Sequence, residues 1–406
     1  MARIVFKFGG TSVSDVAHVR RVAARVVKAF RAGDEAAVVV SAMAGTTDQL
    51  DYWTREIGGM MDAREYDTVV AAGEQITAGL MALALQSEGL MARSWLGWQL
   101  PIETDDAHAR ARIRHIHAAE IEDRLARREI PVLAGFQGIA STGRITTLGR
   151  GGSDTSAVAI AAALNADRCD IYTDVEGVFT ADPRIVPSAK RIERIAYEEM
   201  VELASLGARV LETRAVEMAM RNSVSVQVRS SFHDTPGTLL VDEDEIMEQD
   251  VVTGVTYSRD EAKLTLTGVH DKPGVSASIF GPLAAEGVNV DMIVQSGSHG
   301  GERINYTFTV VERDMERAVR AIEDARNEIG FDSIVADANV AKVSIVGLGM
   351  RTRPGVAQTM FATLAERGIN LQVISTSELK ISVLIDETAT EEAVRALHAA
   401  YGLDSA

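Results

Sequence analysis

The stretch FKFGGTSV, residues 6–13, places a lysine and two glycines directly behind an apolar run near the start of the chain. Residues 2–8 are typical of a short buried strand, and the spaced valines of residues 15–30 predict an amphipathic helix after it. Glycines let a backbone approach a phosphate closely, and a helix N-terminus favours anions. Lys7 adds a positive charge at the carboxyl end of the strand, where open α/β sheets bind their ligands. The loop indicates either a phosphate site or a tight turn with a salt-bridged lysine.

Strands and helices alternate from this point to about residue 240. Apolar runs predict further buried strands, an Ala-rich run predicts a compact helix, and residues 71–85 predict an apolar helix. The expected strands are at 36–43, 130–138, 169–175 and 224–230, and the Ala-rich helix is at 155–166. This alternation predicts a mainly parallel sheet with helices on both faces.

The C-terminal third of the chain repeats itself. The acidic stretch 242–250, DEDEIMEQD, indicates a linker before it, or else a solvated loop inside one domain. Beyond it, DKPGVSASIFGPLAAEGVNV (271–290) matches TRPGVAQTMFATLAERGINL (352–371) at a constant spacing of 81 residues. Each copy predicts strand, turn, helix and strand, with Pro273 and Pro354 at the helix start. We therefore expect two copies of one small βα module, used as a paired binding unit.

The composition is that of a soluble globular protein. The chain has 406 residues, which predicts two or three domains, and it is 46% hydrophobic and 24% charged. No apolar run looks long enough to cross a bilayer, and the N-terminus lacks the pattern of a signal peptide. Cys169 is the single cysteine, which excludes an intramolecular disulfide and favours a small buried residue. A cytoplasmic protein is expected.

The charge of the chain excludes several partner classes. The net charge is −17, and no basic run is present, so neither nucleic acid nor an anionic membrane is an expected partner. The sequence holds no G-x-x-x-x-G-K-[ST] loop, no H-R-D with D-F-G, and no His/Cys cluster with metal-ligand spacing, so no protein-bound metal site is predicted. Any phosphate site must be built locally from a few cations and backbone N–H groups.

Two further glycine-bearing loops follow predicted strands. In SAMAGTTD (41–48), small residues and hydroxyls suit a small polar ligand, or Thr47 or Asp48 simply caps a helix. In TTLGRGGSDTSA (146–157), three glycines crowd Arg150 just before a helix start. Arginine holds a carboxylate with two hydrogen bonds, and a helix N-terminus favours an anion. Capping by Asp154 alone does not explain the glycines, so this loop favours a functional site.

Two other stretches carry polar groups at positions that suit a ligand. YTDVEGVFTADPR (172–184) places Thr173 and Asp174 at a strand end, which suits a nucleotide base and ribose or an ordinary turn-rich connection. AAGEQITAGLMALAL (71–85) carries Glu74 near its start. Glu74 is either a first-turn charge favoured by the helix dipole or the partner of a ligand ammonium group.

Taken together and in this order, these loops resemble the aspartate kinases of the amino-acid kinase family almost end to end. The most specific segments are TTLGRGGSDT and YTDVEGVFTADPR, and the resemblance also covers KFGGTSV, VVVSAMAGTTD, AAGEQI, AGFQG and ISTSELKISVLI. The repeated module resembles a tandem pair of ACT domains, which are βαββαβ units that bind amino acids as feedback signals. The resemblance implies a three-layer αβα kinase domain with a mainly parallel sheet at 1–245 and ferredoxin-like ACT modules at 251–338 and 339–406.

The resemblance also implies roles for individual residues. Lys7 would stabilise the transferring phosphoryl group, and Asp154 would organise the phosphate-binding cations. The ATP site would comprise Lys7, Phe8, Gly9, Gly10, Ser41, Thr173, Asp174, Phe179, Asp182, Pro183, Arg184 and Arg209. The aspartate site would comprise Thr47, Glu74, Arg150, Gly151, Gly152 and Ser153. Arg150 suits the substrate's α-carboxylate and Glu74 its ammonium group.

The implied reaction is transfer of the ATP γ-phosphate to L-aspartate, with nucleotide-bound Mg²⁺, giving 4-phospho-L-aspartate on the way to lysine, threonine and methionine. The nucleophile is the β-carboxylate, whose pKa of ~3.9 leaves it ionised at neutral pH, so no general base is needed. Catalysis then rests on positioning and charge neutralisation.

The ACT resemblance implies feedback inhibition by lysine, threonine or both, and a homo-oligomer formed through these modules. The implied effector residues are Asp271, Lys272, Gly274, Ser276, Ala277, Asn289, Asp291, Gln295, Gly355, Val356, Asn370, Ser375 and Glu378. Met247 stands where some relatives start a separate regulatory subunit. Departures from the family pattern are Arg209, where lysine is common, Asn305, where aspartate is common, and Gln372, where glutamate is common.

Two alternatives to an aspartate kinase remain. One is a kinase for another acidic amino acid on the same fold. The other is a catalytically dead amino-acid sensor, which substitution of Lys7, Arg150 or Asp154 would indicate. All three residues are present.

Overall fold

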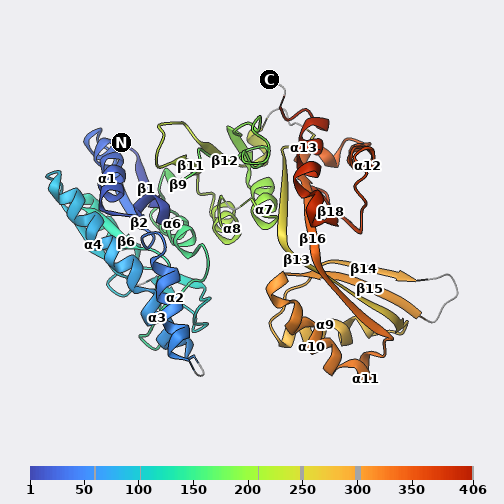
Figure 1. Ribbon diagram of the computed structural model, residues 1–406. Helices are drawn as coiled ribbons and strands as arrows, with labels where there is room; N and C mark the ends of the chain where they lie inside the picture. Colours follow the sequence, from blue (N-terminus) through green and yellow to red (C-terminus); the bar gives the residue numbers. More distant parts are fainter. Residues whose placement is uncertain (59–60, 101, 209, 247–250, 298–302, 405–406) are drawn as a thin grey trace. The chain divides into compact units, whose positions relative to one another are not determined.

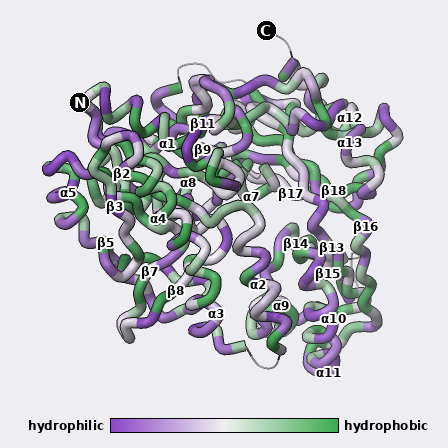
Figure 2. The backbone as a smooth tube through the Cα atoms, turned by 60° about the vertical axis from the view of Figure 1, so that its left-hand side comes forward, coloured by the Kyte–Doolittle hydropathy of each residue, from purple (hydrophilic) through white to green (hydrophobic). Residues whose placement is uncertain are grey.

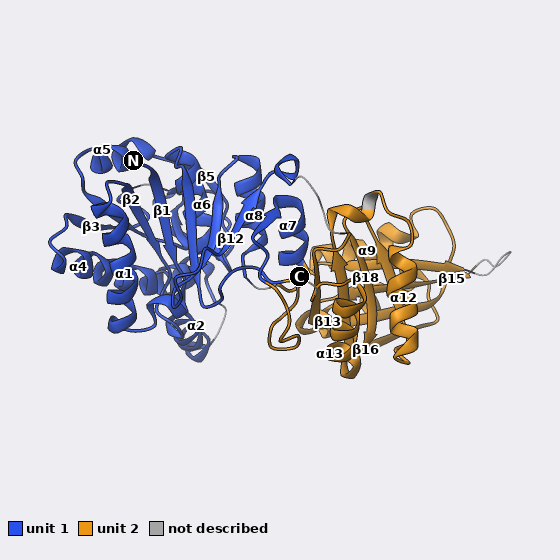
Figure 3. Ribbon diagram, turned by 90° about the horizontal axis from the view of Figure 1, so that it is seen from above, with its two compact units in different colours: residues 1–179, 191–205, 209–248 blue, residues 180–190, 206–208, 249–406 orange. Residues whose placement is uncertain are grey.

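The computed structural model describes residues 1–58, 61–100, 102–208, 210–246, 251–297 and 303–404 (Figure 1). The chain forms two compact units (Figure 3). The first comprises residues 1–179, 191–205 and 209–248, and the second comprises residues 180–190, 206–208 and 249–406. Met247, the position of the suggested internal start, and Arg209 lie outside the described residues.

The main sheet of the first unit has eight strands among its described residues, in the order β10-β12-β11-β9-β1-β2-β6-β3. Every neighbouring pair is parallel except β11 and β12, which confirms the mainly parallel sheet. The strands are β1 (Arg3–Phe8), β2 (Glu35–Val40), β3 (Ala92–Trp95), β6 (Ile130–Ala134), β9 (Arg168–Thr173), β10 (Arg194–Ala196), β11 (Val226–Ser230) and β12 (Thr238–Val241). A smaller sheet contains β4 (Ile102–Thr104), β5 (Ile113–Ile116), β7 (Gln137–Ile139) and β8 (Ile145–Thr147).

Helices cover both faces of the main sheet. Helices α1 (Val16–Arg31) and α4 (Ala72–Ser87) pack against one face, where Phe6 and Phe8 of β1 join their apolar side chains. In Figure 2 much of the tube around the labels β2 and α4 is green, which marks hydrophobic residues. Helix α6 (Gly152–Ala163) contacts β1, β2 and β9 without entering this cluster. Because side chains alternate along a strand, Lys7 points away from Phe6 and Phe8, toward the side of α6.

The other helices of this unit are α2 (Thr46–Ile57), α3 (Ala63–Val70), α5 (Ala118–Ala126), α7 (Tyr197–Ser205) and α8 (Thr213–Arg221). The stretch Ala63–Ser87, which contains α3 and α4, is long and apolar enough to span a membrane by length and composition. The expectation that no such stretch exists was therefore too strong. Half of its most apolar window is buried inside the unit. The stretch also carries two buried carboxyl groups, Asp67 and Glu74, and both have hydrogen-bond partners in the protein.

Several predicted element boundaries shift at the loops. The strand predicted at 36–43 ends at Val40, and the run 130–138 divides into β6 and β7 at Phe136, whose φ is 68°. The predicted cap residues were wrong for both helices, because each begins earlier than the sequence suggested. Gly45 is the N-cap residue of α2, and Gly151, with φ 63°, is that of α6. Thr47, Asp48 and Asp154 instead lie inside the first turns of these helices.

The second unit is built on one antiparallel sheet, whose described strands have the order β14-β15-β13-β16-β18-β17. These are β13 (Gly254–His270), β14 (Asp291–Gly297), β15 (Arg303–Val310), β16 (Ser333–Val346), β17 (Val373–Thr376) and β18 (Lys380–Asp386). The long strands β13 and β16 run through both repeats. Residues 254–258 of β13 pair with 342–346 of β16, whereas residues 263–267 pair with 333–337. The first residues of the predicted first module therefore pair with the predicted second module.

The helices of the second unit repeat in the same way as its sequence. They are α9 (Val275–Ala285), α10 (Met315–Asp324), α11 (Arg326–Ile329), α12 (Val356–Glu366) and α13 (Thr390–Ala400). Gly274 and Gly355 are the N-cap residues of α9 and α12, with φ of 91° and 96°. The prolines just before them therefore lie outside the helices rather than at their first positions, which corrects the predicted start.

Candidate active site

The site forms where the carboxyl ends of four neighbouring parallel strands meet. β1 ends at Phe8, β2 at Val40, β6 at Ala134 and β9 at Thr173, and the register places these ends side by side. The loops that follow them lie along the same edge of the sheet. The structure thereby brings together predicted residues from four distant segments. They are Lys7, Phe8, Gly9, Gly10, Ser41, Ser153, Asp154 and Thr173.

The strand alternation of β1 explains the position of Lys7. Phe6 and Phe8 occupy the apolar layer of α1 and α4, so Lys7 reaches the first turn of α6 on the opposite face. Its Nζ atom forms an ion pair with Asp154 Oδ1, and both side chains are almost fully buried. The salt-bridged lysine foreseen for the tight-turn alternative is therefore present. The pair lies beside the glycine loop. The phosphate site stays a prediction.

The two glycines after β1 lie between Lys7 and the loop that follows β2. Gly9 N donates a hydrogen bond to the Tyr172 carbonyl at 3.1 Å, which fixes the loop against β9. A Cβ atom added at Gly9 would lie 3.5 Å from Lys7 Nζ, and one at Gly10 would lie 3.0 Å from the Ala42 carbonyl oxygen. A side chain at Gly10 would therefore crowd the loop after β2, whereas the distances at Gly9 are those of ordinary van der Waals contact.

Glu74 lies in the first turn of α4, and it is 3% exposed. Its Oε1 atom accepts a hydrogen bond from Ala42 N at 3.0 Å, whereas its buried Oε2 atom has no hydrogen-bond partner. Burial raises the pKa of Glu74 to about 7, although the backbone hydrogen bonds and the charge of Lys7 act to lower it. A buried carboxylate oxygen without a donor is suited to a cationic group of a ligand.

The loop between β8 and α6 supplies a cation and a hydroxyl group. Arg150 is exposed, and Ser153 is buried in the first turn of α6. A Cβ atom added at Gly135 would lie 2.9 Å from Ser153 Oγ, which explains the glycine after β6 in AGFQG. Thr47 lies half-buried in the first turn of α2.

Glu212 is a neighbour of this loop that sequence reasoning missed. A Cβ atom added at Gly151 would lie 2.4 Å from Glu212 Cβ, so Gly151 admits this side chain. Burial and the charge of Asp154 raise the pKa of Glu212, while Arg214 and Arg150 oppose this shift. Its segment, GARVLETRAVE, carries no local signal for a site, because Glu212 reaches the loop only through the packing of α8 against α6.

The predicted nucleotide residues divide between the two units. Thr173 donates a hydrogen bond to Asp174 Oδ1 at 3.1 Å, and Phe179 pairs with Arg191, all within the first unit. Asp182, Pro183 and Arg184 belong to the second unit. There Asp182 accepts a hydrogen bond from Arg184 Nη2 at 2.7 Å and one from Tyr257 OH at 3.3 Å. The bonds from Arg184 lower the pKa of Asp182.

The predicted effector residues lie on both repeats of the second unit. Tyr306 OH lies 2.8 Å from Ser276 Oγ and donates a hydrogen bond to Gln295 Oε1 at 3.1 Å, which links α9 to β14. The Asp291 carboxylate accepts a hydrogen bond from Lys342 Nζ at 2.9 Å. Ser375 is half-buried and Val356 is buried, and the other predicted effector residues are exposed. These are Asp271, Lys272, Gly274, Ser276, Ala277, Asn289, Asp291, Gln295, Gly355, Asn370 and Glu378.

Two of the departures from the family pattern have partners in the same unit. Asn305 Oδ1 accepts a hydrogen bond from Gly268 N at 3.1 Å, and Gln372 Oε1 contacts Lys263 Nζ. Across the described ranges, no group of three or more His, Cys, Asp or Glu side chains is arranged to hold a metal ion.

Comparison with known sequences and structures defines the class of the protein. Residues 2–230 match the amino acid kinase family, and residues 264–325 and 343–401 match the ACT domain. The aspartate kinase of Pseudomonas putida is 49% identical over 406 residues, which cover 100% of this chain and 98% of that protein.

Solved structures agree with this assignment. E. coli aspartokinase III in complex with aspartate and ADP, in the R-state, aligns with a TM-score of 0.81 and 27% identity over 98% of this chain and 99% of that one. The same enzyme in complex with lysine and aspartate, in the T-state, aligns with a TM-score of 0.75 and 26% identity over 98% of both chains. The chain described here belongs to the aspartate kinases of the amino acid kinase family. It is a phosphotransferase enzyme with C-terminal ACT domains.

Proposed function

We propose that this enzyme transfers the γ-phosphoryl group of ATP to the β-carboxylate of L-aspartate and produces 4-phospho-L-aspartate, the first step towards lysine, threonine and methionine. The observation that carries the proposal is Glu74, whose buried Oε2 atom lacks a hydrogen-bond partner and whose carboxyl group interacts with the charge of Lys7. A second cation, Arg150, lies in the loop before α6, where its charge acts on Glu212. An amino-dicarboxylic acid would supply an ammonium group for Glu74 and carboxylates for the cations. Aspartate bound in the E. coli relative supports the same substrate.

In the proposed complex Glu74 receives the substrate ammonium group and Arg150 its α-carboxylate, with Thr47, Gly151, Gly152 and Ser153 around the substrate. The β-carboxylate then lies toward Lys7. One of its oxygen atoms forms a bond to the γ-phosphorus as the bond from that phosphorus to the β–γ bridging oxygen breaks, which leaves ADP. No proton is transferred, because the carboxylate is already ionised at neutral pH.

The charge in this step develops on the phosphoryl oxygens and on the leaving phosphate. Lys7 supplies a positive charge at the end of β1, and Asp154 holds its ammonium group in place. The backbone at Gly9 and Gly10 approaches the phosphate chain without side chains in the way. We assign Phe8, Ser41, Thr173, Asp174 and Phe179 of the first unit to the rest of the nucleotide site.

Magnesium would be held mainly by the phosphates. This fits the described residues, which hold no cluster of three carboxylates or histidines, because Mg²⁺ keeps several waters and is bound through substrate phosphates in such enzymes. Bound there, Mg²⁺ would neutralise phosphate charge. Asp154 is already paired with Lys7, so its part is to orient that cation.

We further propose that residues 251–338 and 339–406 form a regulatory pair that binds lysine, threonine or both, in a homo-oligomer, and that residues 1–245 form the catalytic domain. Lysine bound in the T-state E. coli relative supports this. The first effector site would be built around the Ser276–Tyr306–Gln295 chain of hydrogen bonds. A separate regulatory subunit starting at Met247 would appear as a second, shorter polypeptide in native extracts, and its absence there would rule out the internal start.

The test is aspartate-dependent ATP turnover with Mg²⁺, in which hydroxylamine traps the acyl phosphate as a hydroxamate. Hydroxamate formed with aspartate supports the proposal, and repeating the assay with lysine, threonine and both assigns the effectors. Turnover only with glutamate or another acid would change the substrate and leave the kinase assignment intact. No turnover with any acidic amino acid would contradict the proposed reaction and favour a sensor.

A further inference from the structure

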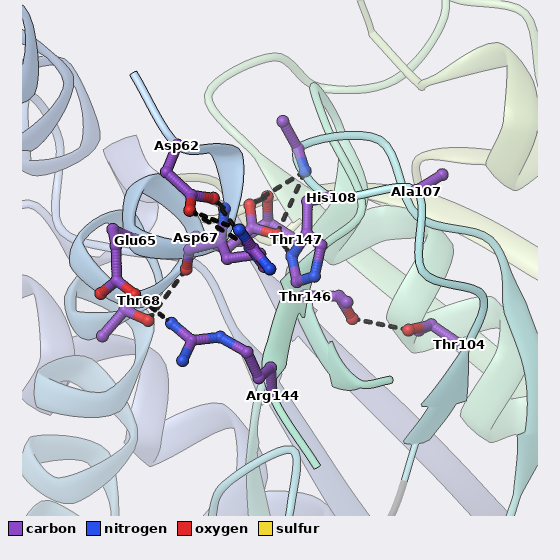
Figure 4. Close-up of polar contacts among 12 residues, drawn as sticks. Asp62, Glu65, Asp67, Thr68, Thr104, Ala107, His108, Arg144, Thr146 and Thr147 are labelled. Atoms are coloured by element: carbon purple, nitrogen blue, oxygen red, sulfur yellow. Dashed lines mark hydrogen bonds and ion pairs between the residues drawn. The ribbon is translucent and has the colours of Figure 1, made fainter. Parts of the chain in front are cut away.

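Asp67 is a fully buried carboxyl group outside the predicted site, and it lies at the centre of a hydrogen-bond network (Figure 4). It lies on α3. Its oxygens accept hydrogen bonds from His108 Nδ1 at 2.7 Å, from Ala109 N at 3.0 and 3.1 Å, and from Thr147 Oγ1. With these three donors already engaged, the carboxyl group joins protein segments to one another.

The donors to Asp67 belong to the segments that carry and support Arg150. Thr147 is the last residue of β8, three positions before Arg150. Ala109 adopts φ 64°, a left-handed conformation uncommon for alanine, so the surrounding contacts must hold it there. A Cβ atom added at Gly149 would lie 3.3 Å from the Ala109 carbonyl oxygen. The loop at Ala109 therefore lies directly against the residue that precedes Arg150.

The helix of Asp67 leads directly to Glu74. Ala71 N donates a hydrogen bond to the Asp67 carbonyl at 3.1 Å, and α4 begins at the next residue, Ala72. Gln137 Nε2 donates to the Ala71 carbonyl at 3.1 Å, which anchors this junction to β7. Asp67 therefore links the segment that carries the proposed ammonium partner to the loop that carries the proposed carboxylate partner.

We propose that Asp67 is a positioning residue that sets the relative placement of Glu74 and Arg150, and through them the affinity and orientation of the acidic amino acid. This inference rests on the proposed function. The glycine loop of the nucleotide side is held by different contacts, such as that from Gly9 N to the Tyr172 carbonyl. A substitution of Asp67 should therefore lower the affinity for the acidic amino acid and leave the affinity for the nucleotide unchanged.

The test compares Asp67→Asn with wild type in hydroxamate assays that vary aspartate and ATP separately. Asparagine keeps the size of the side chain but turns an NH₂ group toward one of the donors. The KM for aspartate is expected to rise about 10- to 100-fold, because small displacements of positioning groups cost that much. The KM for ATP is expected to stay within about twofold.

Two further variants separate positioning from general stability. Thr147→Val keeps the branched shape and removes one donor to Asp67, so the KM for aspartate should rise by a smaller factor, about 3- to 10-fold. The matched control is Tyr197→Phe, which removes a buried hydrogen bond of 2.7 Å to the Val224 carbonyl in the same unit. That control is expected to lower the melting temperature and to leave both KM values unchanged.

An unchanged KM for aspartate in Asp67→Asn, with a lowered melting temperature like that of Tyr197→Phe, would overturn the inference. An equal rise in both KM values would also overturn it. If Asp67→Asn does not fold, Thr147→Val decides, and an unchanged KM for aspartate there counts against positioning.

Calorimetric titration with aspartate repeats the comparison without turnover. Wild type that neither binds nor turns over aspartate would refute the proposed substrate first. The same variants are then compared with whichever acidic amino acid the wild type accepts. If it accepts none, the inference falls together with the proposed function, and this outcome differs from a defect confined to the variants.

Discussion

Lys7 of β1 and Asp154 of α6 form an ion pair whose side chains are only 10% and 12% exposed. The pair joins the end of the first strand to the first turn of a helix that begins far along the chain. A lysine held in this way presents its charge at a fixed point beside the glycine loop. Two variants at this pair test its catalytic and structural roles separately.

Lys7→Met keeps the apolar stem of the side chain and removes the charge. The kcat for hydroxamate formation is expected to fall at least about 10³-fold, because the charge that stabilises the transferring phosphoryl group is lost. Asp154 would remain buried without its partner, which costs about 3–5 kcal/mol of the free energy of unfolding. The double variant Lys7→Met with Asp154→Asn should regain stability and not activity. Recovery of activity in the double variant would contradict the role given to Lys7.

Glu74 predicts a pH dependence of substrate binding. Its pKa is raised to about 7, and the substrate ammonium group favours the ionised carboxylate. The KM for aspartate should therefore fall as the pH rises from about 6 to 8 in the wild type. Glu74→Gln should show a KM that is higher by about 10- to 100-fold at pH 8 and nearly independent of pH. A wild-type KM that is flat over this range would show that Glu74 does not meet the ammonium group.

The same residue predicts a stability change in the enzyme without substrate. Below its ordinary pKa of 4.5, Glu74 is protonated in both the folded and unfolded chains. Between this value and about 7 only the unfolded chain releases the proton, so stability falls as the pH rises through this window. Glu74→Gln is therefore expected to be more stable than wild type at pH 8, by up to about 3 kcal/mol. Denaturant unfolding of both proteins at pH 4.5 and pH 8 measures this difference in the free energy of unfolding. A difference between wild type and Glu74→Gln that is the same at both pH values would contradict the prediction.

Gly135→Ala tests the packing between β6 and α6. Its Cβ atom would lie 2.9 Å from Ser153 Oγ and 3.0 Å from the Val40 carbonyl oxygen, so Ser153 must move. The KM for aspartate is expected to rise about 10-fold or more. Gly79→Ala on α4 is the matched control, because nothing lies within 4 Å of its added methyl group, and alanine favours a helix by about 1 kcal/mol. Equal kinetics for both variants would show that the close approach at Gly135 has no effect on the substrate.

The buried ion pairs of Lys342 predict a stability effect in the second unit. Its Nζ atom lies 2.7 Å from Glu261 Oε1 and 2.9 Å from Asp291 Oδ2, and Lys342 and Glu261 are almost fully buried. Lys342→Met should lower the free energy of unfolding of this unit by about 3–5 kcal/mol, because it leaves a buried carboxylate unpaired. Arg259→Met, which breaks an exposed pair with Glu391, should cost less than about 1 kcal/mol. Equal effects of the two changes on the melting temperature would contradict this difference in burial.

Local sequence patterns predicted those strands, helices and loops whose conformation depends on residues adjacent in the sequence. Alternating strands and helices, the glycines beside Lys7 and the repeated βα modules could all be read directly, because backbone conformation and side-chain alternation follow short-range rules. The predicted boundaries erred where glycines take left-handed conformations, at Gly45 and Gly151, because a chain can turn into a helix there before the apolar pattern begins.

The sequence by itself determined the class of the fold, the glycine-lined strand ends and the paired modules. Each of these features depends on residues that lie close together along the chain. Only the tertiary structure decided which polar groups meet. Asp67 reaches Thr147, Glu212 reaches Gly151, and Glu74 becomes buried with one free oxygen atom because strands and helices from distant segments pack together. The continuous strand β13, shared between the two repeats, is likewise a product of packing. Burial and long-range hydrogen bonds depend on distances through space, and these distances are set only when the sheet assembles.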